Sequence, residues 1–274
     1  MASWLVRHLA GYAPPALRRG LAGALMDFRS LNSRLSNPGR LREPWSFIHN
    51  IGDGDFQAIG AQLKHNLINH AGLLGSDHVL DIGCGNGRVA EPLAPLLRDE
   101  GSYVGFDLSR AAIRMSRRRF VDQPHMRFVH LDVWNGEYNP AGRLAEQETA
   151  FPVADRSIDL AFATSVFTHM RMAAVRHYIC ESARVLKPGG RLAFTCFALQ
   201  QGREASDKFN FVPFDETSAV IDRRTPERAI AHRRVALEAA VTEAGLKIRC
   251  ELNGHWAPGG NYDGGQDLFV AEKA

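Results

Sequence analysis

The sequence lacks the cysteine pattern of a secreted or zinc-binding protein. Its four cysteines show neither paired spacing nor the spacing of metal ligands: Cys84, Cys180, Cys196 and Cys250. Disulfides belong to oxidising compartments, whereas isolated thiols are typical of reducing ones. Because no secretory signal is recognisable either, we expect a cytoplasmic protein with free thiols.

An excess of charge of one sign and long apolar runs are also missing. The 274 residues include 33 Lys and Arg and 30 Asp and Glu, a formal net charge of +3, which gives no electrostatic reason to expect a nucleic-acid partner. The first apolar run is broken by Arg7 and His8 and is too short to span a membrane. Residues 14–31 mix arginines with leucines and could lie on a membrane surface, but a helical lid over the core is the simpler interpretation. We expect no integral membrane contact, and the oligomeric state stays open.

Apolar segments alternate with helical patterns along most of the chain. Asp55 and Ser109 are placed to cap helices over 56–71 and 110–120, and further helices are predicted over 87–98, around 175–186, and from Thr225 to Gly245. Such alternation predicts an α/β protein with a doubly wound, mostly parallel seven-stranded sheet. The last two strands have only a loop between them and are expected to pair antiparallel. The seven predicted strands are 78–83, 102–108, 126–132, 157–164, 191–197, 247–253 and 266–273.

The chain divides into two parts on this interpretation. Residues 1–50 form an N-terminal helical lid, and residues 51–274 form the main domain. Residues 199–224 interrupt the alternation and resemble an inserted cap. The lid and the cap together would shape the pocket for a substrate at the edge of the sheet where the strands end.

A glycine-rich turn follows the first strand, in the stretch "DIGCGNGR" at residues 81–88. A dinucleotide fingerprint needs a third glycine where Arg88 stands, which disfavours an oxidoreductase, and no GxxxxGK[ST] motif suggests phosphoryl transfer. Asp81, Asp107 and Asp132 end three successive strands. Carboxylates at the second and third positions could accept hydrogen bonds from ribose hydroxyls and from the amine of adenine. Alternatively, an Asp at a strand end can cap the next helix or turn.

These motifs carry a resemblance to a known family. "VLDIGCGNGR", "GFD", "HLD", "SVFTHM" and "RVLKPGG" resemble the successive motifs of class I S-adenosylmethionine-dependent methyltransferases, from about residue 50 to the C-terminus. "GDFQAIG", "YNPAG", "FPVADRSIDL", "TPERAIAHR" and "QDLFVAEK" are similar to a bacterial subgroup associated with saccharide and polysaccharide biosynthesis. The resemblance implies a Rossmann-like fold and S-adenosylmethionine as the cofactor and methyl donor.

The resemblance also implies a role for each motif residue. The glycines of the turn would let the backbone approach the cofactor, Asp81 would reach its methionine amino group, Asp107 its ribose and Asp132 its adenine amine. Leu108 and Val133 would lie beside the adenine, and Thr164 would line the sulfonium end. Arg88 could touch the cofactor's carboxylate, although beginning a helix is its alternative role. The full set implied to bind cofactor is Asp81, Gly83, Cys84, Gly85, Asn86, Gly87, Arg88, Asp107, Leu108, Asp132, Val133, Thr164 and Ser165.

The stretch "ATSVFTHM" bears on the acceptor. It lacks the Asn/Asp-Pro-Pro-Tyr-like motif of enzymes that methylate base amines, and it lacks the Pro-Cys nucleophile of enzymes that methylate a cytosine carbon. Oxygen methylation of a small hydroxylated molecule remains, and a saccharide is the favoured acceptor. His169 is the candidate general base, since a base within hydrogen-bond reach contributes roughly 10²–10⁴-fold. Its alternative role is a helix-start residue bonded to the backbone. His49, His255 and His232, the last on the predicted final helix, are the other candidates.

Three further possibilities stay open. A divalent metal such as Mg²⁺ serves some sugar methyltransferases, but no His and carboxylate cluster in this sequence has ligand spacing. The acceptor atom could be nitrogen or carbon of another small metabolite. A non-catalytic subunit that binds S-adenosylmethionine would retain the same glycine turn.

Overall fold

The computed structural model describes residues 55–97, 100–206 and 209–274, together with a few positions between 17 and 36. Apart from those positions, the predicted lid at residues 1–50 and the candidate His49 lie outside the described residues. Among the described residues, no helix is both long and apolar enough to cross a membrane.

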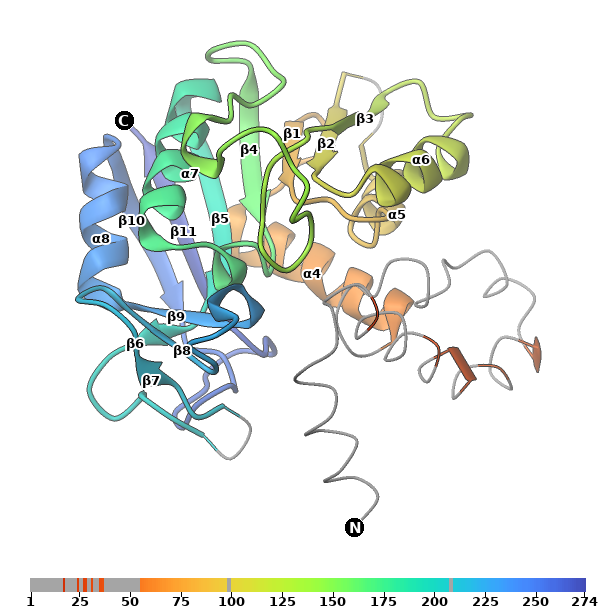
Figure 1. Cartoon of the computed structure of the whole chain (residues 1–274). Coiled ribbons are helices and arrows are strands. Elements are labelled where there is room, and N and C mark those ends of the chain that lie inside the picture. Colours follow the sequence, from red (N-terminus) through yellow and green to blue (C-terminus); the bar gives the residue numbers. More distant parts are fainter. Residues whose placement is uncertain are drawn as a thin grey trace.

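A seven-stranded sheet forms the centre of the molecule, in the order β10-β11-β5-β4-β1-β2-β3 (Figure 1). Strands β1 to β5 run parallel wherever they are neighbours, and β11 is antiparallel to both β5 and β10. This confirms the predicted doubly wound sheet and its antiparallel C-terminal strand. The strands are β1 (His78–Ile82), β2 (Ser102–Asp107), β3 (Met126–His130), β4 (Ile158–Ala163), β5 (Leu186–Cys196), β10 (Leu246–Leu252) and β11 (Asp267–Lys273).

Helices cover both faces of this sheet (Figure 1). Successive strand residues point to opposite faces, so Val79 and Leu80 of β1 belong to different apolar cores. Val79 packs in one core with α4 (Phe56–Ala71), α5 (Ala90–Leu93) and α6 (Arg110–Arg119). Leu80 packs in the other with α7 (Met172–Val185) and α8 (Arg234–Glu243). The near-complete burial of the central strands follows from this two-sided cover.

Local signals determine where two of the helices begin. The Asp55 side chain accepts a hydrogen bond from the Ala58 N–H (2.9 Å), and the Ser109 hydroxyl accepts one from the Ala112 N–H (3.3 Å), as the sequence predicts. The helix predicted over 87–98 is wrong in extent, because only Ala90–Leu93 is α-helical. Pro95 supplies no backbone N–H, and Gly87 has a φ of 82°, so the predicted helix cannot extend through either residue.

The helix predicted from Thr225 to Gly245 is wrong in where it begins. Pro226–Arg228 makes one 3₁₀ turn, η4, and the chain then extends into β9 (Ile230–Arg233) before α8 begins at Arg234. His232 therefore lies on a strand rather than on the last helix. Strand β9 belongs to a second sheet, with the order β6-β9-β8-β7.

This second, smaller sheet lies at one end of the large one (Figure 1). Its other strands are β6 (Ala198–Leu199), β7 (Val212–Pro213) and β8 (Ser218–Val220), so most of it comes from the predicted cap segment 199–224. Its side chains pack in their own apolar core around Phe197, Phe211 and Trp256. Because β6 follows β5 after one residue, this sheet joins the large sheet at the carboxyl end of β5.

The connection between β3 and β4 has only the short 3₁₀ turn η2 (Glu146–Glu148) as regular helical structure. The sequence predicts a loop over most of this connection, and residues 132–146 form one that is held by its own hydrogen bonds. Single bridges join Val133 to Leu144 and Asn135 to Asn139. Arg143 N and Leu144 N both donate to the Asp132 carbonyl (2.9 Å each). We call residues 132–146 the β3–β4 loop.

Candidate functional site

The candidate site lies where the strand order of the large sheet reverses. β1 pairs with β2 on one side and with β4 on the other, so their crossover connections leave the sheet in opposite directions. The glycine turn, Asp107 and Thr164 all follow the carboxyl ends of these strands. In open α/β sheets this edge is where ligands bind.

The glycine turn adopts a backbone that other residues rarely adopt. Gly83, Gly85 and Gly87 have φ values of 74°, 54° and 82°. A Cβ on Gly83 would lie 2.5 Å from a methyl carbon of Val166, and one on Gly87 would lie 2.8 Å from the ring of Phe120. The turn is anchored to β2, since the N–H groups of Gly83 and Cys84 both donate to the Phe106 carbonyl (2.9 and 3.0 Å). The conformation and the packing of this turn therefore both require glycine. The expected approach of a ligand to its backbone stays a prediction.

Asp81 is buried beside this turn, with 1% of its surface exposed. One carboxylate oxygen, Oδ2, accepts a hydrogen bond from the Tyr103 hydroxyl (2.6 Å), while Oδ1 has no partner within the described residues. Burial raises the pKa of Asp81 to about 7, although the hydrogen bond from Tyr103 opposes this rise. A buried acceptor without a partner needs an explanation, and a cationic donor such as an ammonium group fits it.

Asp107 has the capping role that the sequence left open. Its oxygens accept hydrogen bonds from Gly85 N (2.8 Å) and Ser109 N (2.7 Å), so it fixes the glycine turn and the chain entering α6. Burial raises its pKa, against the two backbone hydrogen bonds. Each carboxylate oxygen can accept a second hydrogen bond. Capping by Asp107 therefore leaves it able to accept from ribose hydroxyls.

Asp132 has partners within the β3–β4 loop that the sequence did not predict. It accepts hydrogen bonds from Arg143 Nε (2.8 Å) and Asn139 Nδ2 (3.2 Å), and the bond from Arg143 is the main reason that its pKa lies below the ordinary value. These contacts hold the loop at the end of β3. The expected contact with an adenine amine stays a prediction.

Two other residues of the turn are buried with unpartnered polar atoms. Neither the amide oxygen nor the amide nitrogen of Asn86, a residue with no exposed surface, has a partner among the described residues. The Arg88 guanidinium lies 5.7 Å from the centre of the Phe56 ring, and burial lowers its pKa to about 10. Since α5 begins at Ala90, Arg88 does not start that helix. Burial also raises the pKa of the Cys84 thiol well above its usual range.

The remaining predicted residues follow the ends of their strands. Leu108 follows β2 and is half-buried, and Val133 is buried at the start of the β3–β4 loop. Thr164 and Ser165 follow β4, and Ser165 has a φ of 57°, a left-handed backbone that is uncommon outside glycine. Ser165 N donates to Thr195 Oγ1 (2.8 Å), and its hydroxyl donates to Gln266 Oε1 (3.2 Å). Sequence reasoning missed Thr195 and Gln266, which come together with Ser165 only through the pairing of β5 with β4 and β11.

His169 ends the 3₁₀ turn η3 (Phe167–His169), before α7. Its Nδ1 lies 2.8 Å from the Glu227 carbonyl oxygen, and its Nε2 lies 3.4 Å from the Tyr138 hydroxyl. Because a carbonyl only accepts, Nδ1 carries the proton and Nε2 keeps its lone pair. Burial lowers the pKa of His169 below its ordinary value, which favours this neutral form. The ring does bond the backbone, and its other nitrogen is left able to act as a base.

The other candidate histidines are less well placed. His232 is fully buried on β9, with Nε2 2.9 Å from the Phe167 carbonyl oxygen. The same logic places a proton on Nε2, and Nδ1 is enclosed without a partner in the described part of the chain. His255 is exposed on the loop that precedes β11.

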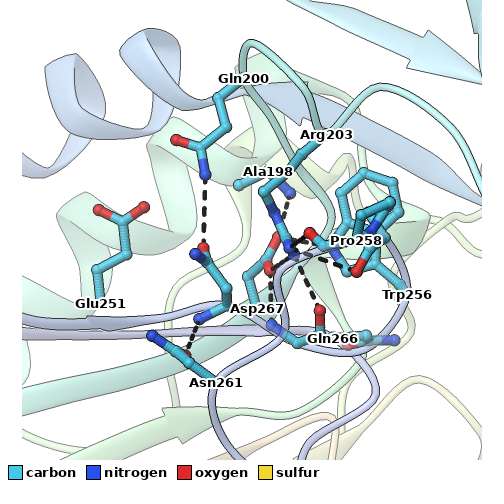
Figure 2. A network of polar contacts seen from close by, with 12 residues as sticks. Ala198, Gln200, Arg203, Glu251, Trp256, Pro258, Asn261, Gln266 and Asp267 are labelled. Carbon is cyan, nitrogen blue, oxygen red and sulfur yellow. Dashed lines mark hydrogen bonds and ion pairs between the residues drawn. The ribbon is translucent and has the colours of Figure 1, made fainter.

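A buried ion pair fixes the loop between β10 and β11 at this edge of the sheet (Figure 2). Asp267 accepts from Arg203 Nη2 (2.6 Å), Gly254 N (2.8 Å), Ala198 N (2.8 Å) and Trp256 Nε1 (2.7 Å). The Arg203 guanidinium also donates to the carbonyl oxygens of Gly254 and Pro258. This network ties residues 198–203 and 254–258 to the start of β11, next to Gln266.

Metal ligands and surface hollows are the other features that could mark a site. In the described ranges, no three His, Cys, Asp or Glu residues are grouped so that they could hold a metal ion. A surface hollow is lined in part by Leu97, Gln123 and His125, which precede β2 and β3. It therefore lies at the opposite edge of the sheet from the glycine turn.

Comparisons with known proteins agree with this geometry. Residues 80–194 match the family model described as a methyltransferase domain. The chain is 27% identical over 141 residues to a demethylmenaquinone methyltransferase of Symbiobacterium thermophilum, covering 52% of this chain and 50% of that protein. It is 32% identical over 127 residues to an O-methyltransferase of Pyrenophora dematioidea, covering 46% of this chain and 41% of that protein. The chain thus spans about half the length of the curated relatives it matches.

Solved structures share the fold at low sequence identity. A SAM-dependent methyltransferase from Aquifex aeolicus superposes with a TM-score of 0.51 at 17% identity, over 89% of this chain and 98% of that one. Geranyl diphosphate C-methyltransferase from Streptomyces coelicolor A3(2), solved with S-adenosyl-L-homocysteine, superposes with a TM-score of 0.55 at 16% identity, over 79% and 81%. At these sequence identities the likeness shows a shared fold and nothing more.

Proposed function

We propose that this protein, whose residues 80–194 match a methyltransferase domain model, binds S-adenosylmethionine and transfers its methyl group to a hydroxyl of a small acceptor. One observation carries the proposal: a glycine turn with three positive φ values, a buried carboxylate oxygen without a partner and a neutral histidine follow the ends of two neighbouring strands, β1 and β4. The first two features fit the cofactor, and the third fits proton removal from an acceptor.

The cofactor contacts follow from the side chains at the edge of the sheet. Asp81 Oδ1 would accept from the methionine ammonium group, for which it offers a buried acceptor. Asp107 would accept from the ribose hydroxyls with the lone pairs that its backbone contacts leave over. Asp132 would accept from the adenine amine, and Leu108 and Val133 would pack beside the ring.

His169 would act as the general base. When bound, the cofactor supplies an electrophilic methyl group whose bond to sulfur breaks as the bond to the acceptor oxygen forms. The acceptor's hydroxyl proton passes to His169 Nε2, while Nδ1–H stays bonded to the Glu227 carbonyl. A positioned base contributes roughly 10²–10⁴-fold. The rest of the rate would come from holding oxygen, methyl and sulfur in line.

The finer proposal is a saccharide acceptor, which rests on the motif resemblance alone. None of the relatives described above is named for a saccharide. Carbon methylation is the second candidate, because one structural neighbour is named a C-methyltransferase and one relative is named for demethylmenaquinone. His169 would serve both reactions, since removal of a phenolic proton also activates a neighbouring ring carbon.

The test has two steps. Calorimetry should show S-adenosylmethionine binding to the full chain, and lack of binding would overturn the proposal. Release of S-adenosylhomocysteine is then measured with methyl glycosides, oligosaccharides, a simple phenol and a reduced quinone as acceptors. The ¹³C chemical shift of the transferred methyl separates oxygen from carbon products. Turnover restricted to carbon would replace the oxygen assignment, and turnover on the phenol or quinol alone would remove the saccharide.

A further inference from the structure

Asn135, in the β3–β4 loop, uses every hydrogen bond that an amide side chain can make. Its Nδ2 donates to Glu146 Oε1 (3.0 Å) and to the His169 carbonyl oxygen (3.1 Å). Its Oδ1 accepts from the N–H groups of Glu137 and Tyr138 (3.1 Å each). The residue is only 2% exposed. Two donors and two acceptor lone pairs are the full capacity of an amide, so both ends of this side chain are fixed.

These four bonds join two segments that are distant in the sequence. The β3–β4 loop supplies Asn135, Glu137, Tyr138 and Glu146, and η3 supplies His169. The Tyr138 ring packs edge to face on the His169 ring, with centroids 5.1 Å apart at 75°. Its hydroxyl lies 3.4 Å from His169 Nε2. One amide therefore fixes the main chain of both residues of a His–Tyr pair.

We propose that Asn135 is a positioning residue for the His169 base, holding His169 and Tyr138 so that Nε2 is presented with its lone pair toward the Tyr138 hydroxyl. This role rests on the proposed function, because the position of Nε2 matters only if it takes a proton from the acceptor. It goes beyond that function by assigning a role to Asn135, which lies outside the quoted motifs, and to Tyr138, which lies in "YNPAG" but was given no role there.

Tyr138 suits both protonation states of the histidine. A hydroxyl can donate or accept, so Tyr138 donates to the single lone pair of neutral Nε2. The acceptor's proton then reaches Nε2 through this hydroxyl: the Tyr138 oxygen takes that proton as it gives its own to Nε2, and afterwards it accepts from Nε2–H. Nδ1–H stays bonded to the Glu227 carbonyl throughout. The imidazolium that forms thus keeps a partner on each nitrogen, which lowers the free energy of the charged form.

Charged groups lie near the His169–Tyr138 pair, so it matters that the Asn135 side chain is neutral. The Glu137 carboxylate partly opposes the burial that lowers the pKa of His169, and the Glu227 carbonyl accepts from the His169 ring. Glu146 interacts with Glu227 and Arg171, and Arg171 Nε lies 3.4 Å from the Glu227 carboxylate. The imidazole of His232 lies behind η3, bonded to the Phe167 carbonyl. A neutral amide satisfies Glu146 without adding charge beside His169. A carboxylate at position 135 would repel Glu146 and favour the imidazolium.

The test follows the His169 ring nitrogens by NMR in ¹⁵N-labelled full-length protein, assigned by the signals lost in His169→Gln. The wild type should show proton on Nδ1 and lone pair on Nε2. Asn135→Asp keeps the acceptor for the two N–H groups but adds a charge, and should raise the pKa of His169 by roughly one pH unit or more. The control variant Asn69→Asp makes the same change on α4, where the amide contacts His65. It should leave the pKa of His169 unchanged.

Tyr138→Phe gives a second, independent readout. It keeps the ring and removes the acceptor for Nε2–H, so it should lower the pKa of His169, the opposite direction to Asn135→Asp. S-adenosylhomocysteine affinity should stay within about twofold in both variants. If Asn135→Asp fails to fold, Tyr138→Phe decides. An unmoved pKa in folded variants would overturn the positioning role, whereas absence of S-adenosylmethionine binding by the wild type would overturn the proposed function instead.

Discussion

At the scale of single residues, Asp81 shows a conflict between stability and binding. A carboxylate with a folded-state pKa of about 7 binds its proton more tightly than in the unfolded chain, where the value is near 3.8. The folded state therefore holds more protons between about pH 4 and pH 7, and the stability that Asp81 contributes falls as the pH rises through this window. A group that costs stability at neutral pH is typical of a binding site.

Asp81→Asn tests this conflict. The amide oxygen can still accept from the Tyr103 hydroxyl, and no buried charge remains. We expect the variant to melt roughly 3–6 °C above the wild type at pH 8, with the difference shrinking as the pH is lowered toward 4. Calorimetry at pH 8 should show S-adenosylmethionine affinity falling more than about tenfold, since a charge-assisted hydrogen bond is lost. Higher stability with full affinity would show that Asp81 does not bind the cofactor.

Two variants of Asp107 test its expected role in ribose binding against its role in capping the turn. Asp107→Ala removes both roles and should lower S-adenosylmethionine affinity at least tenfold, because charge-assisted hydrogen bonds contribute on the order of 1.5–3 kcal/mol. Asp107→Asn keeps an acceptor for only one of the Gly85 and Ser109 N–H groups, and it loses the charge together with the second acceptor. Both affinities are measured by calorimetry, with folding checked by circular dichroism. Unchanged affinity in a folded Ala variant would remove Asp107 from the cofactor site.

His169 should affect turnover rather than cofactor binding. A base that acts only in the transition state leaves the ground state unchanged, so His169→Ala should bind S-adenosylmethionine like the wild type and lose at least about a hundredfold in rate. Because burial lowers the pKa of His169, the wild-type rate should rise with pH through an ionisation below the ordinary histidine value. The pH profile of S-adenosylhomocysteine release should lose this step in the variant. Retained turnover would move the base to another residue.

At the scale of elements, the strands were predictable because each carries a short apolar run bounded by turn residues. The helix from Thr225 was not, although Thr-Pro-Glu is a typical helix start. Residues 230–233 instead pair with β8 and β6, and long-range pairing outweighs the local helix signal. The Thr225 hydroxyl makes no cap and is buried without a partner in the described structure.

The residues of the candidate site also fall into two groups, those with a local sequence signal and those without one. The glycine turn and the Asp residues at strand ends have sequence signals, because each depends on one strand and the turn that follows it. Asn135 has none, and Tyr138 and Gln266 lie in quoted motifs that give them no role. Each acquires its role from a contact across more than thirty residues of chain. Nothing in the local pattern around Asn135 distinguishes it from Asn139, the other Asn of the loop.

The Arg203–Asp267 pair should control the stability of the edge that the small sheet shares with the large one. Both side chains are almost fully buried, at 6% and 1% exposure. Arg203→Met leaves the Asp267 charge without its cation and should lower the free energy of unfolding by about 3–5 kcal/mol. Urea denaturation measures this loss, with Arg249→Met as a control, because Arg249 is half exposed in its pair with Glu272. Equal effects of the two variants would contradict a structural role for the buried pair.

At the scale of the whole molecule, the cofactor and acceptor functions would lie on different parts of one edge. The glycine turn, Asp107 and Asp132 belong to β1–β3, whereas His169 packs against η4, which leads into the small sheet. The β3–β4 loop connects the two parts, since it holds Asp132 at one end and Asn135 against His169. A cofactor site on the common fold can thus be combined with an acceptor site specific to this chain.

Closure of this edge is the remaining requirement, because methyl transfer needs a site from which water is excluded. Residues 1–50 mix arginines with leucines and lack a sustained apolar run, which favours a lid over a membrane anchor. We predict that hydrogen exchange in this segment slows when S-adenosylhomocysteine binds, and slows further with an acceptor identified in the panel above. Exchange is measured by mass spectrometry on the full chain, with α6 as the internal reference. Sedimentation with anionic vesicles is the matching control. Tight binding to the vesicles, together with exchange that ligands leave unchanged, would assign the segment to a membrane surface.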